Sequence, residues 1–368
     1  MKKWMRMSAL LLVMVLITGM LSACAGTGEK TPAQTTPAGE QSKEKISLKI
    51  SHHPYLHALP GYYAEKNGWY DEAGFDYSVT MYAGGPPQNE ALASDAWEVG
   101  TTGTGGAILG AIGYNLKIIG FTSGDTNTVD LWVRPDHPIA QAKGKIEGYP
   151  NVYGTPDQWK GLTVLAASAT STHMTLLSTL DVLKLKESDI KMVDMAVAQA
   201  FPAFKAGQGD MVALWSPFGY LAEKEGWVKV SSAKDVKILL PCLIVASEKA
   251  VKEKPEAVQK WLEVYMRGVD EVQKDANKAA NELFIFEKEN GIKLSEEDAT
   301  LEIKNRPFPT IAEQKQLFAK DGKEFSEAES ALLKFVDFLI AQGRIKPEER
   351  QKLIDNKFVD NSFITKLN

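Results

Sequence analysis

The chain contains 368 residues, 44% of them apolar and 24% charged, and its formal net charge is −5 at pH 7. These values describe an ordinary soluble protein that is long enough for two lobes with proper cores. No basic block occurs in the sequence, which argues against nucleic acid as a partner.

The N-terminal residues predict the compartment. A basic segment, Met1–Arg6, precedes the apolar stretch Ala9–Met20, which is too short to span a membrane comfortably. Leu21-Ser22-Ala23-Cys24 follows and resembles the bacterial lipobox. We therefore predict a signal peptide over residues 1–23 and a lipoprotein whose Cys24 carries the lipid, with palmitate as an expected acyl chain. The body would then lie outside the cytoplasm, anchored to the cell membrane. An uncleaved N-terminal anchor is the alternative.

Residues 24–44 are rich in Thr, Pro, Gly, Gln and Lys and contain almost nothing to bury. This composition predicts a disordered linker between the lipid anchor and the globular body. The chain has only two cysteines. With Cys24 acylated, Cys242 would be alone, and no disulfide is expected.

From Ile46 onward, short apolar strands alternate with helices, which predicts an α/β fold with mostly parallel sheets covered on both faces. The expected strands of the first set are 46–50, 77–82, 97–99, 117–121 and 129–133. The expected helices of this set are 59–66, 88–96 and 108–113, with a turn rich in Gly and Thr over 100–106.

A second set of alternating elements follows from about Lys160. Its expected strands are 163–167, 190–195, 211–215 and 228–230, its expected helices are 172–183, 198–205 and 218–225, and the apolar run 238–245 closes it. The remainder is predicted to be helical. Apolar residues between Val258 and Val269 repeat at helical spacing, and Ser326–Glu329 resembles a capping box before another amphipathic stretch.

The segment Thr163–Leu177 predicts an anion-binding turn. A buried strand passes through small hydroxyl residues, Ser168 to Thr172, into a helix. The free backbone N–H groups and the dipole at a helix N-terminus favour an anion. The alternative is that Ser171 or Thr172 only caps the helix.

Six segments together carry a wider pattern. They are Pro60–Tyr70, Glu98–Thr104, Lys160–Val164, Thr170–Leu177, Phe204–Asp210 with Trp215-Ser216-Pro217, and Leu353–Phe363. In this order they resemble the substrate-binding proteins of bacterial ABC importers, specifically the nitrate, sulfonate and taurine group. The similarity covers essentially the whole body from Ile46 onward.

The resemblance implies a bilobal, periplasmic-binding-protein-like (type II) fold with a hinged ligand cleft between two sheets flanked by helices. Residues 45–130 and 241–368 would form a discontinuous first lobe, and residues 131–240 the second. The expected partners are a small anionic ligand, such as a sulfonate, taurine-like or nitrate-like solute, and the permease and ATPase of an ABC importer. A monomer without a cofactor is expected.

The resemblance also places ligand contacts in loops at the strand ends. The candidate residues are His52, His53, Thr102, Gly103, Thr104, Ser168, Thr170, Ser171, Thr172, His173 and Trp215. No Arg occurs in these loops, so anion recognition by neutral donors is predicted, with added charge if His53 or His173 is protonated. Contact between His173 and the ligand is left open. Taurine binders have an Asp in the return crossover where this chain has Pro241, and Asp125 or Asp130 would have to replace it.

Three alternatives remain at this point. His52, His53 and His57 could hold a metal ion in a metal-uptake lipoprotein. The ligand could instead be a pyrimidine-type compound or an aromatic acid. The third alternative is an enzyme of the same fold, such as the pyrimidine-precursor synthase or a Ser/His hydrolase. The cysteine-rich iron motif and the Gly-x-Ser-x-Gly elbow that these would need are both missing, so a protein without enzyme activity is expected.

Overall fold

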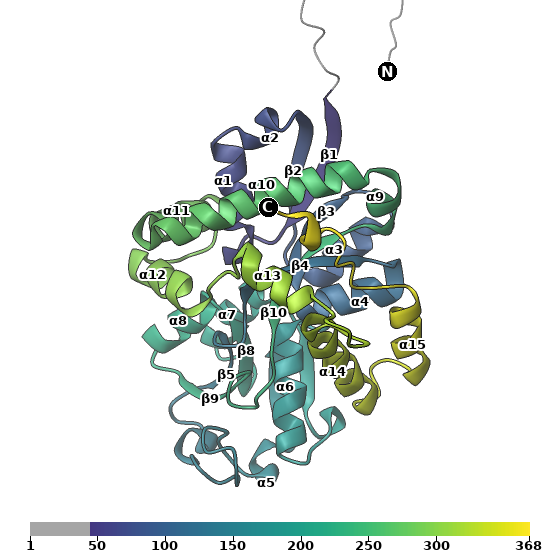
Figure 1. Ribbon diagram of the computed structural model, residues 1–368. Helices are drawn as coiled ribbons and strands as arrows, with labels where there is room; N and C mark the ends of the chain where they lie inside the picture. The colour runs from purple at the N-terminus through teal and green to yellow at the C-terminus, as the bar shows by residue number, and fades with distance from the viewer. Residues whose placement is uncertain (1–44) are drawn as a thin grey trace, which may run out of the picture. The chain divides into compact units, whose positions relative to one another are not determined.

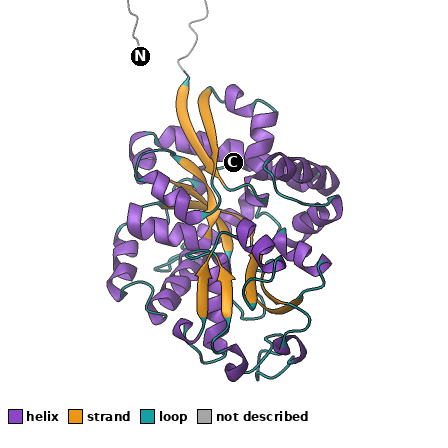
Figure 2. Cartoon of the chain, turned by 180° about the vertical axis from the view of Figure 1, so that it is seen from behind, coloured by secondary structure: helices purple, strands orange, loops and turns teal. Residues whose placement is uncertain are grey.

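The computed structural model describes residues 45–368, so the predicted signal peptide, Cys24 and the linker lie outside the described residues. Within this range, two five-stranded sheets are flanked by helices (Figure 1). Figure 2 shows the strands of both sheets in orange between helices in purple. The described residues group as one compact unit by their contacts, and a division into lobes therefore stays a prediction.

The first sheet has the strand order β2-β1-β3-β10-β4. Its strands are β1 (Ile46–His52), β2 (Phe75–Met81), β3 (Val99–Gly103), β4 (Lys117–Gly124) and β10 (Pro241–Ala246). Strand β1 pairs in parallel with β2 and β3, whereas β10 lies antiparallel between β3 and β4. Four strands therefore run in one direction and one runs in reverse.

The second sheet repeats this plan with the order β7-β6-β8-β5-β9. Its strands are β5 (Val129–Val133), β6 (Thr163–Ala166), β7 (Lys191–Asp194), β8 (Met211–Trp215) and β9 (Val228–Ser232). Strand β6 is parallel to β7 and β8, and β5 is antiparallel to β8 and β9. Along the chain, the reversed strand of each sheet comes directly after a strand of the other sheet: β5 comes after β4, and β10 comes after β9. The chain thus passes between the sheets twice, over residues 125–128 and 233–240.

Helices cover both sheets, and the C-terminal third is almost entirely helical. The α-helices are α1 (Leu59–Lys66), α2 (Trp69–Glu72), α3 (Gly85–Leu92), α4 (Thr104–Tyr114), α5 (Pro156–Trp159), α6 (Ser171–Val182), α7 (Val197–Lys205), α8 (Phe218–Lys224), α9 (Glu248–Glu253), α10 (Pro255–Lys274), α11 (Ala276–Glu289), α12 (Glu296–Asn305), α13 (Ile311–Phe318), α14 (Glu327–Ala341) and α15 (Pro347–Asp355). The capping box before α14 is confirmed, because Ser326 and Glu329 bond to each other's backbone N–H.

The expected turn over residues 100–106 is wrong, because residues 100–103 belong to β3 and Thr104 begins α4. Gly100 is required for close packing rather than for a turn: a Cβ at this position would lie 2.1 Å from the carbonyl oxygen of Ser51 in β1. Helix α3 also begins earlier than expected, with two prolines in its first turn, where a missing N–H group costs nothing.

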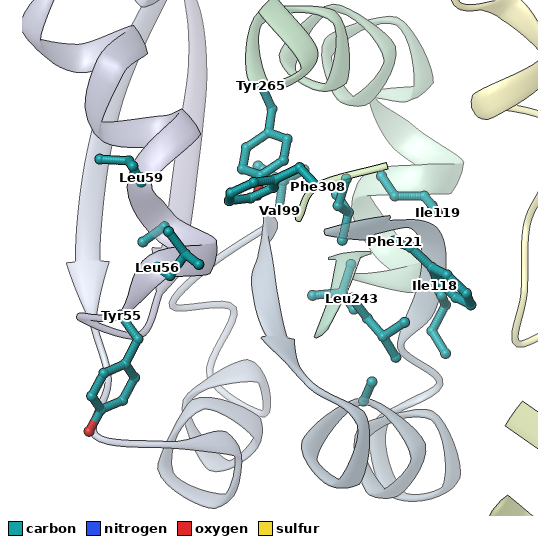
Figure 3. Packing of buried hydrophobic residues seen from close by; sticks show 14 of the residues in the cluster. Tyr55, Leu56, Leu59, Val99, Ile118, Ile119, Phe121, Leu243, Tyr265 and Phe308 are labelled. Atoms are coloured by element: carbon teal, nitrogen blue, oxygen red, sulfur yellow. The ribbon is translucent and has the colours of Figure 1, made fainter. Parts of the chain in front are cut away.

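Two clusters of buried apolar side chains hold the described residues together. The smaller one packs on one face of the second sheet. The larger one joins α1 and α10 to the first sheet and continues to Leu214 and Trp215 at the end of β8. Figure 3 shows part of this cluster, with the Tyr55 hydroxyl pointing away from the other labelled side chains. The core therefore reaches the region where the two sheets meet.

Candidate functional site

A cavity of about 430 Å³ lies where the ends of both sheets meet. It is lined by His53, Tyr55, His57, Gly84, Gly85, Gly103, Gly106, Asp125, Thr170, Ser171, Trp215, Ser216 and Arg306. Of the candidate residues from the sequence, five line this cavity: His53, Gly103, Thr170, Ser171 and Trp215.

Three helices begin at this cavity. The N-cap residues of α3, α4 and α6 are Gly84, Gly103 and Thr170, and all three line it. None of these N-caps accepts a hydrogen bond from the helix through its side chain. The first N–H groups of three helices and the positive ends of their dipoles therefore face one small volume, which suits an anionic group.

Glycines allow these helices to begin so close together. A Cβ at Gly85 would lie 2.6 Å from the Cα atom of Gly106, so the starts of α3 and α4 touch backbone to backbone. A Cβ at Gly105 would lie 2.9 Å from the carbonyl oxygen of Ala169, just before α6. Helix α4 follows β3 of the first sheet, and α6 follows β6 of the second sheet. These contacts therefore join the two sides of the cavity.

The hydroxyl residues at the start of α6 have different surroundings. Thr170 donates to the carbonyl oxygen of Ala167 at 2.7 Å, and its Oγ1 lies 2.9 Å from that of Thr172. Thr172 is fully buried and does not line the cavity. The alternative that Ser171 or Thr172 only caps the helix is therefore wrong. Within residues 45–368, the Ser171 hydroxyl has no hydrogen-bond partner, which leaves it available inside the cavity.

The histidines near the cavity are uncharged. His53 Nε2 donates to Gln88 Oε1 at 3.0 Å, since the Gln88 amide nitrogen itself donates to Ser51. Burial lowers the pKa of His53 to about 4. His52 and His57 each place Nδ1 2.8 Å from the Thr101 hydroxyl, and burial lowers the pKa of His52 to about 3 and that of His57 well below its usual value. Added charge from a protonated His53 is therefore not supported at neutral pH.

These histidines do not form a metal site. His52 and His57 both turn a ring nitrogen to the same hydroxyl, and His53 is occupied by Gln88. Across residues 45–368, no group of three or more His, Cys, Asp or Glu side chains is placed to hold a metal ion. The metal-uptake alternative therefore has no support from this geometry.

Six of the candidate residues lie outside the cavity lining. Thr172 is one of these. His52 is buried and bonds to the Thr101 hydroxyl, and Thr102 is buried next to Gly106. The Thr104 hydroxyl donates to the Pro241 carbonyl oxygen. Ser168 lies in a neighbouring hollow, where its N–H donates to Asp194.

His173, the sixth, contacts side chains rather than the cavity. Its Nδ1 accepts from the Ala169 N–H group, and its Nε2 lies 3.4 Å from both Glu187 and Arg344, which pair with each other. Burial and the charge of Arg344 lower the pKa of His173 to about 4. A charged His173 is therefore not supported either.

Several lining residues were missed by the sequence reasoning, and Arg306 is the most important of them. It follows α12, is 3% exposed and pairs with Asp125 and Glu302. Two carboxylates thus offset its single positive charge. The expectation of an anion site without an arginine needs correction, but the helix N-termini and neutral donors still supply the positive potential. No local motif around Arg306 signals its role, whereas Asp125 is already a candidate from the sequence, and it lines the cavity while Asp130 does not.

Aromatic rings form another part of the wall. Tyr55, which follows β1, and Trp215, which ends β8, meet edge to face with ring centroids 5.7 Å apart. The Trp215 Nε1 is buried without a partner among residues 45–368, so it can donate to a ligand. Burial raises the pKa of Tyr55 to about 12, which keeps its hydroxyl protonated. This wall can therefore pack against an apolar or aromatic part of a solute.

In the described part of the chain, no helix has both the length and the apolar composition needed to cross a membrane.

Sequence comparisons relate the chain to transport proteins. Residues 41–283 match the NMT1-like family. The chain is 27% identical over 355 residues to a protein of Brachyspira hyodysenteriae described as an ABC transporter periplasmic binding protein, with 96% of each chain covered. A protein of Bacillus subtilis described as an aliphatic sulfonates-binding protein is 24% identical over 70% of this chain and 72% of its own length.

Solved structures show the same fold. The alkanesulfonate-binding protein of Xanthomonas axonopodis, bound to MOPS, has a TM-score of 0.67 at 16% identity, with 86% of this chain and 99% of that chain covered. The nitrate-binding protein of Synechocystis has a TM-score of 0.63 at 14% identity, with 87% of each chain covered. The periplasmic-binding-protein-like fold expected from the sequence is thereby confirmed.

Proposed function

Because the chain belongs to the NMT1-like family, we propose that it is an extracytoplasmic solute-binding protein that captures a small anionic solute and delivers it to an ABC importer. The observation that carries this proposal is the convergence of α3, α4 and α6, all without a side-chain cap, on one cavity between two sheets. The relatives support the class of protein, since they are described as binding proteins. Capture rather than catalysis is therefore proposed.

We propose a sulfonate-like or nitrate-like ligand. The negative oxygens would lie at the helix N-termini, near Ser171, where free N–H groups and a free hydroxyl are available. Relatives described by sulfonate and nitrate binding support this choice. Tyr55 and Trp215 favour a second candidate, an aromatic acid whose ring packs against theirs.

Residues 45–130 with 241–368, and residues 131–240, are proposed to move as two lobes. The chain connects the two sheets only through residues 125–128 and 233–240 in the described range. Two short crossovers permit a hinge motion that encloses a ligand between the sheets.

A thermal-shift screen of the mature protein tests the ligand class. We expect alkanesulfonates, nitrate or aromatic acids to raise the melting temperature in a concentration-dependent manner, because a ligand that binds only the folded state stabilises it. Primary amines without an acidic group and divalent metals serve as controls. A stabilising response to metals or amines, with none to any anion, would overturn the proposal.

The proposed location outside the cytoplasm includes a lipid anchor on Cys24. Replacing Cys24 with Ser should abolish fatty-acid incorporation and leave an uncleaved precursor or release the protein into the medium. Metabolic labelling with a radioactive fatty acid, followed by fractionation of cells and medium, measures both effects. Equal labelling of the Cys24→Ser variant and the wild type would contradict the anchor.

A further inference from the structure

Arg306 contacts parts of the chain that belong to both sheets. On the side of the first sheet, its guanidinium donates to the Gly124 carbonyl oxygen at 3.2 Å and to the Asp125 carboxylate. On the side of the second sheet, it donates to the Ser216 hydroxyl at 3.2 Å. Glu302 in α12 accepts a further bond at 2.7 Å. Asp125, Ser216 and Arg306 all line the cavity.

Helix α12, which precedes Arg306, packs against α11 and also bonds to α8 on the side of the second sheet. Lys224 at the end of α8 pairs with the buried carboxylate of Asp298 and donates to the Ser295 hydroxyl at 3.0 Å. Asn305 donates to the Tyr220 hydroxyl at 3.2 Å. Figure 1 shows α8 and α12 side by side. The helix before Arg306 therefore bonds to the side of the second sheet through Asp298, as Arg306 itself does through Ser216.

The same guanidinium lies at both passages of the chain between the sheets. Gly124 ends β4 and Asp125 begins the first passage. Cys242, whose Sγ lies 3.8 Å from the Arg306 guanidinium, lies just after the second passage. A planar guanidinium can bond to several acceptors at fixed angles, which a lysine ammonium cannot reproduce. Separating the two sides would leave buried charged groups without some of their partners, and this is costly.

We propose that Arg306 is a positioning residue that ties the two walls of the cavity together and favours the arrangement in which they lie close. It acts as a connection between the sheets in addition to the two covalent passages. The inference rests on the proposed function only in assuming that the cavity binds a solute. The contacts themselves, and the test below, do not depend on any ligand.

Hydrogen–deuterium exchange of the mature protein without ligand tests the proposal, with Arg306→Lys as the variant. We expect exchange to accelerate by about tenfold or more in two separate segments, residues 124–128 and 214–220, because both lose a charged hydrogen-bond partner. Protected N–H groups report on both: Asp125 donates to Leu240, and Ser216 donates to Thr128. Acceleration in only one segment, or only within α12, would overturn the proposal.

Arg134→Lys is the matched control. The Arg134 guanidinium donates to the carbonyl oxygens of Gly209, Phe204 and Gln208, all on the side of the second sheet, and does not line the cavity. We expect this variant to change exchange near residues 204–209 and to leave residues 124–128 unchanged. Denaturant unfolding of both variants separates local opening from a loss of global stability, which a merely structural arginine would also produce.

A second variant, Ser216→Ala, keeps the proposal testable if Arg306→Lys does not fold. It removes the Arg306 bond on one side and leaves both carboxylate pairs intact. We expect several-fold faster exchange across the cavity, in residues 124–128. Unchanged exchange there would contradict the proposed connection. Because no ligand is used, a failed ligand screen and a failed connection give different results.

Discussion

Replacing Ser171 with Ala should lower the affinity for the solute about ten- to hundredfold. Its hydroxyl lies in the cavity without a partner among the described residues, so a bound anion is its expected acceptor. Each lost hydrogen bond to a charged group costs about 1.5–3 kcal/mol of binding free energy. Stability should change little, because this side chain caps nothing. Titration calorimetry with the compound that gives the largest thermal shift measures the dissociation constant.

Thr172→Ala is the matched control, one position further along the same helix. Thr172 is fully buried, and its hydroxyl bonds with that of Thr170. We expect this variant to lose about 1 kcal/mol of unfolding free energy while its affinity stays close to that of the wild type. If both variants bound the solute like the wild type, or if Thr172→Ala lost more affinity than Ser171→Ala, the anion site at α6 would have to be abandoned.

Replacing Glu287 with Gln should stabilise the protein at alkaline pH. Glu287 in α11 is fully buried, and neither carboxylate oxygen has a partner within residues 45–368. Burial, with the nearby charge of Glu302, raises its pKa well above the usual 4.5. The folded state therefore retains a proton that the unfolded state releases, so this group costs stability as the pH rises above about 4.5.

Denaturant unfolding between pH 5 and pH 8 measures this effect. The wild type should lose stability relative to Glu287→Gln as the pH rises, and the difference should be smallest at the acid end of this range, because the unfolded state releases most of its proton only above about pH 4.5. Equal stability of the two proteins at every pH would show that Glu287 is not protonated in the folded state.

Glu302→Gln makes the same substitution at a buried carboxylate that has an ionic partner. We expect it to lower the free energy of unfolding, whereas Glu287→Gln should raise it. Glu302 bonds with Arg306, and both are almost fully buried. Removing one partner of a buried ion pair costs about 3 kcal/mol when the remaining charge is left uncompensated. Arg306 keeps the Asp125 carboxylate, so we expect a destabilisation smaller than this. A stabilising effect at pH 7 would mean that the charges of this network are not arranged as the geometry indicates.

Elements with strong local signals were predicted closely from the sequence. Helix α1 and strands β5 and β8 have the predicted bounds, α7 begins one residue earlier than predicted, and α6 is shifted by one residue at both ends. In each case apolar periodicity and flanking turn residues occur within a few positions of the element itself. The α/β fold and the resemblance to importer binding proteins rest on such signals and on the order of short motifs.

Errors occurred where a distant contact determines the local structure. Gly100 and its neighbours have the composition of a turn, yet they form a central strand because β1 approaches Gly100 too closely for a side chain. The sequence leaves open whether His173 touches a ligand, and the structure places its ring beside Arg344 and Glu187 rather than in the cavity lining. Neither partner is close to it in the sequence, so periodicity cannot reveal either.

The sequence by itself determined the alternation of strands and helices and the family resemblance, and it predicts the start of α6 as a place for an anion. Only the tertiary structure decided which side chains share the cavity. Arg306 and Asp125 are 181 positions apart, and they meet because α12, packed against α11 and bonded to α8, ends beside the first passage between the sheets. Local patterns report on the backbone within a few residues. A charged cavity wall is instead formed by packing between segments whose separation along the chain carries no information about their distance in space.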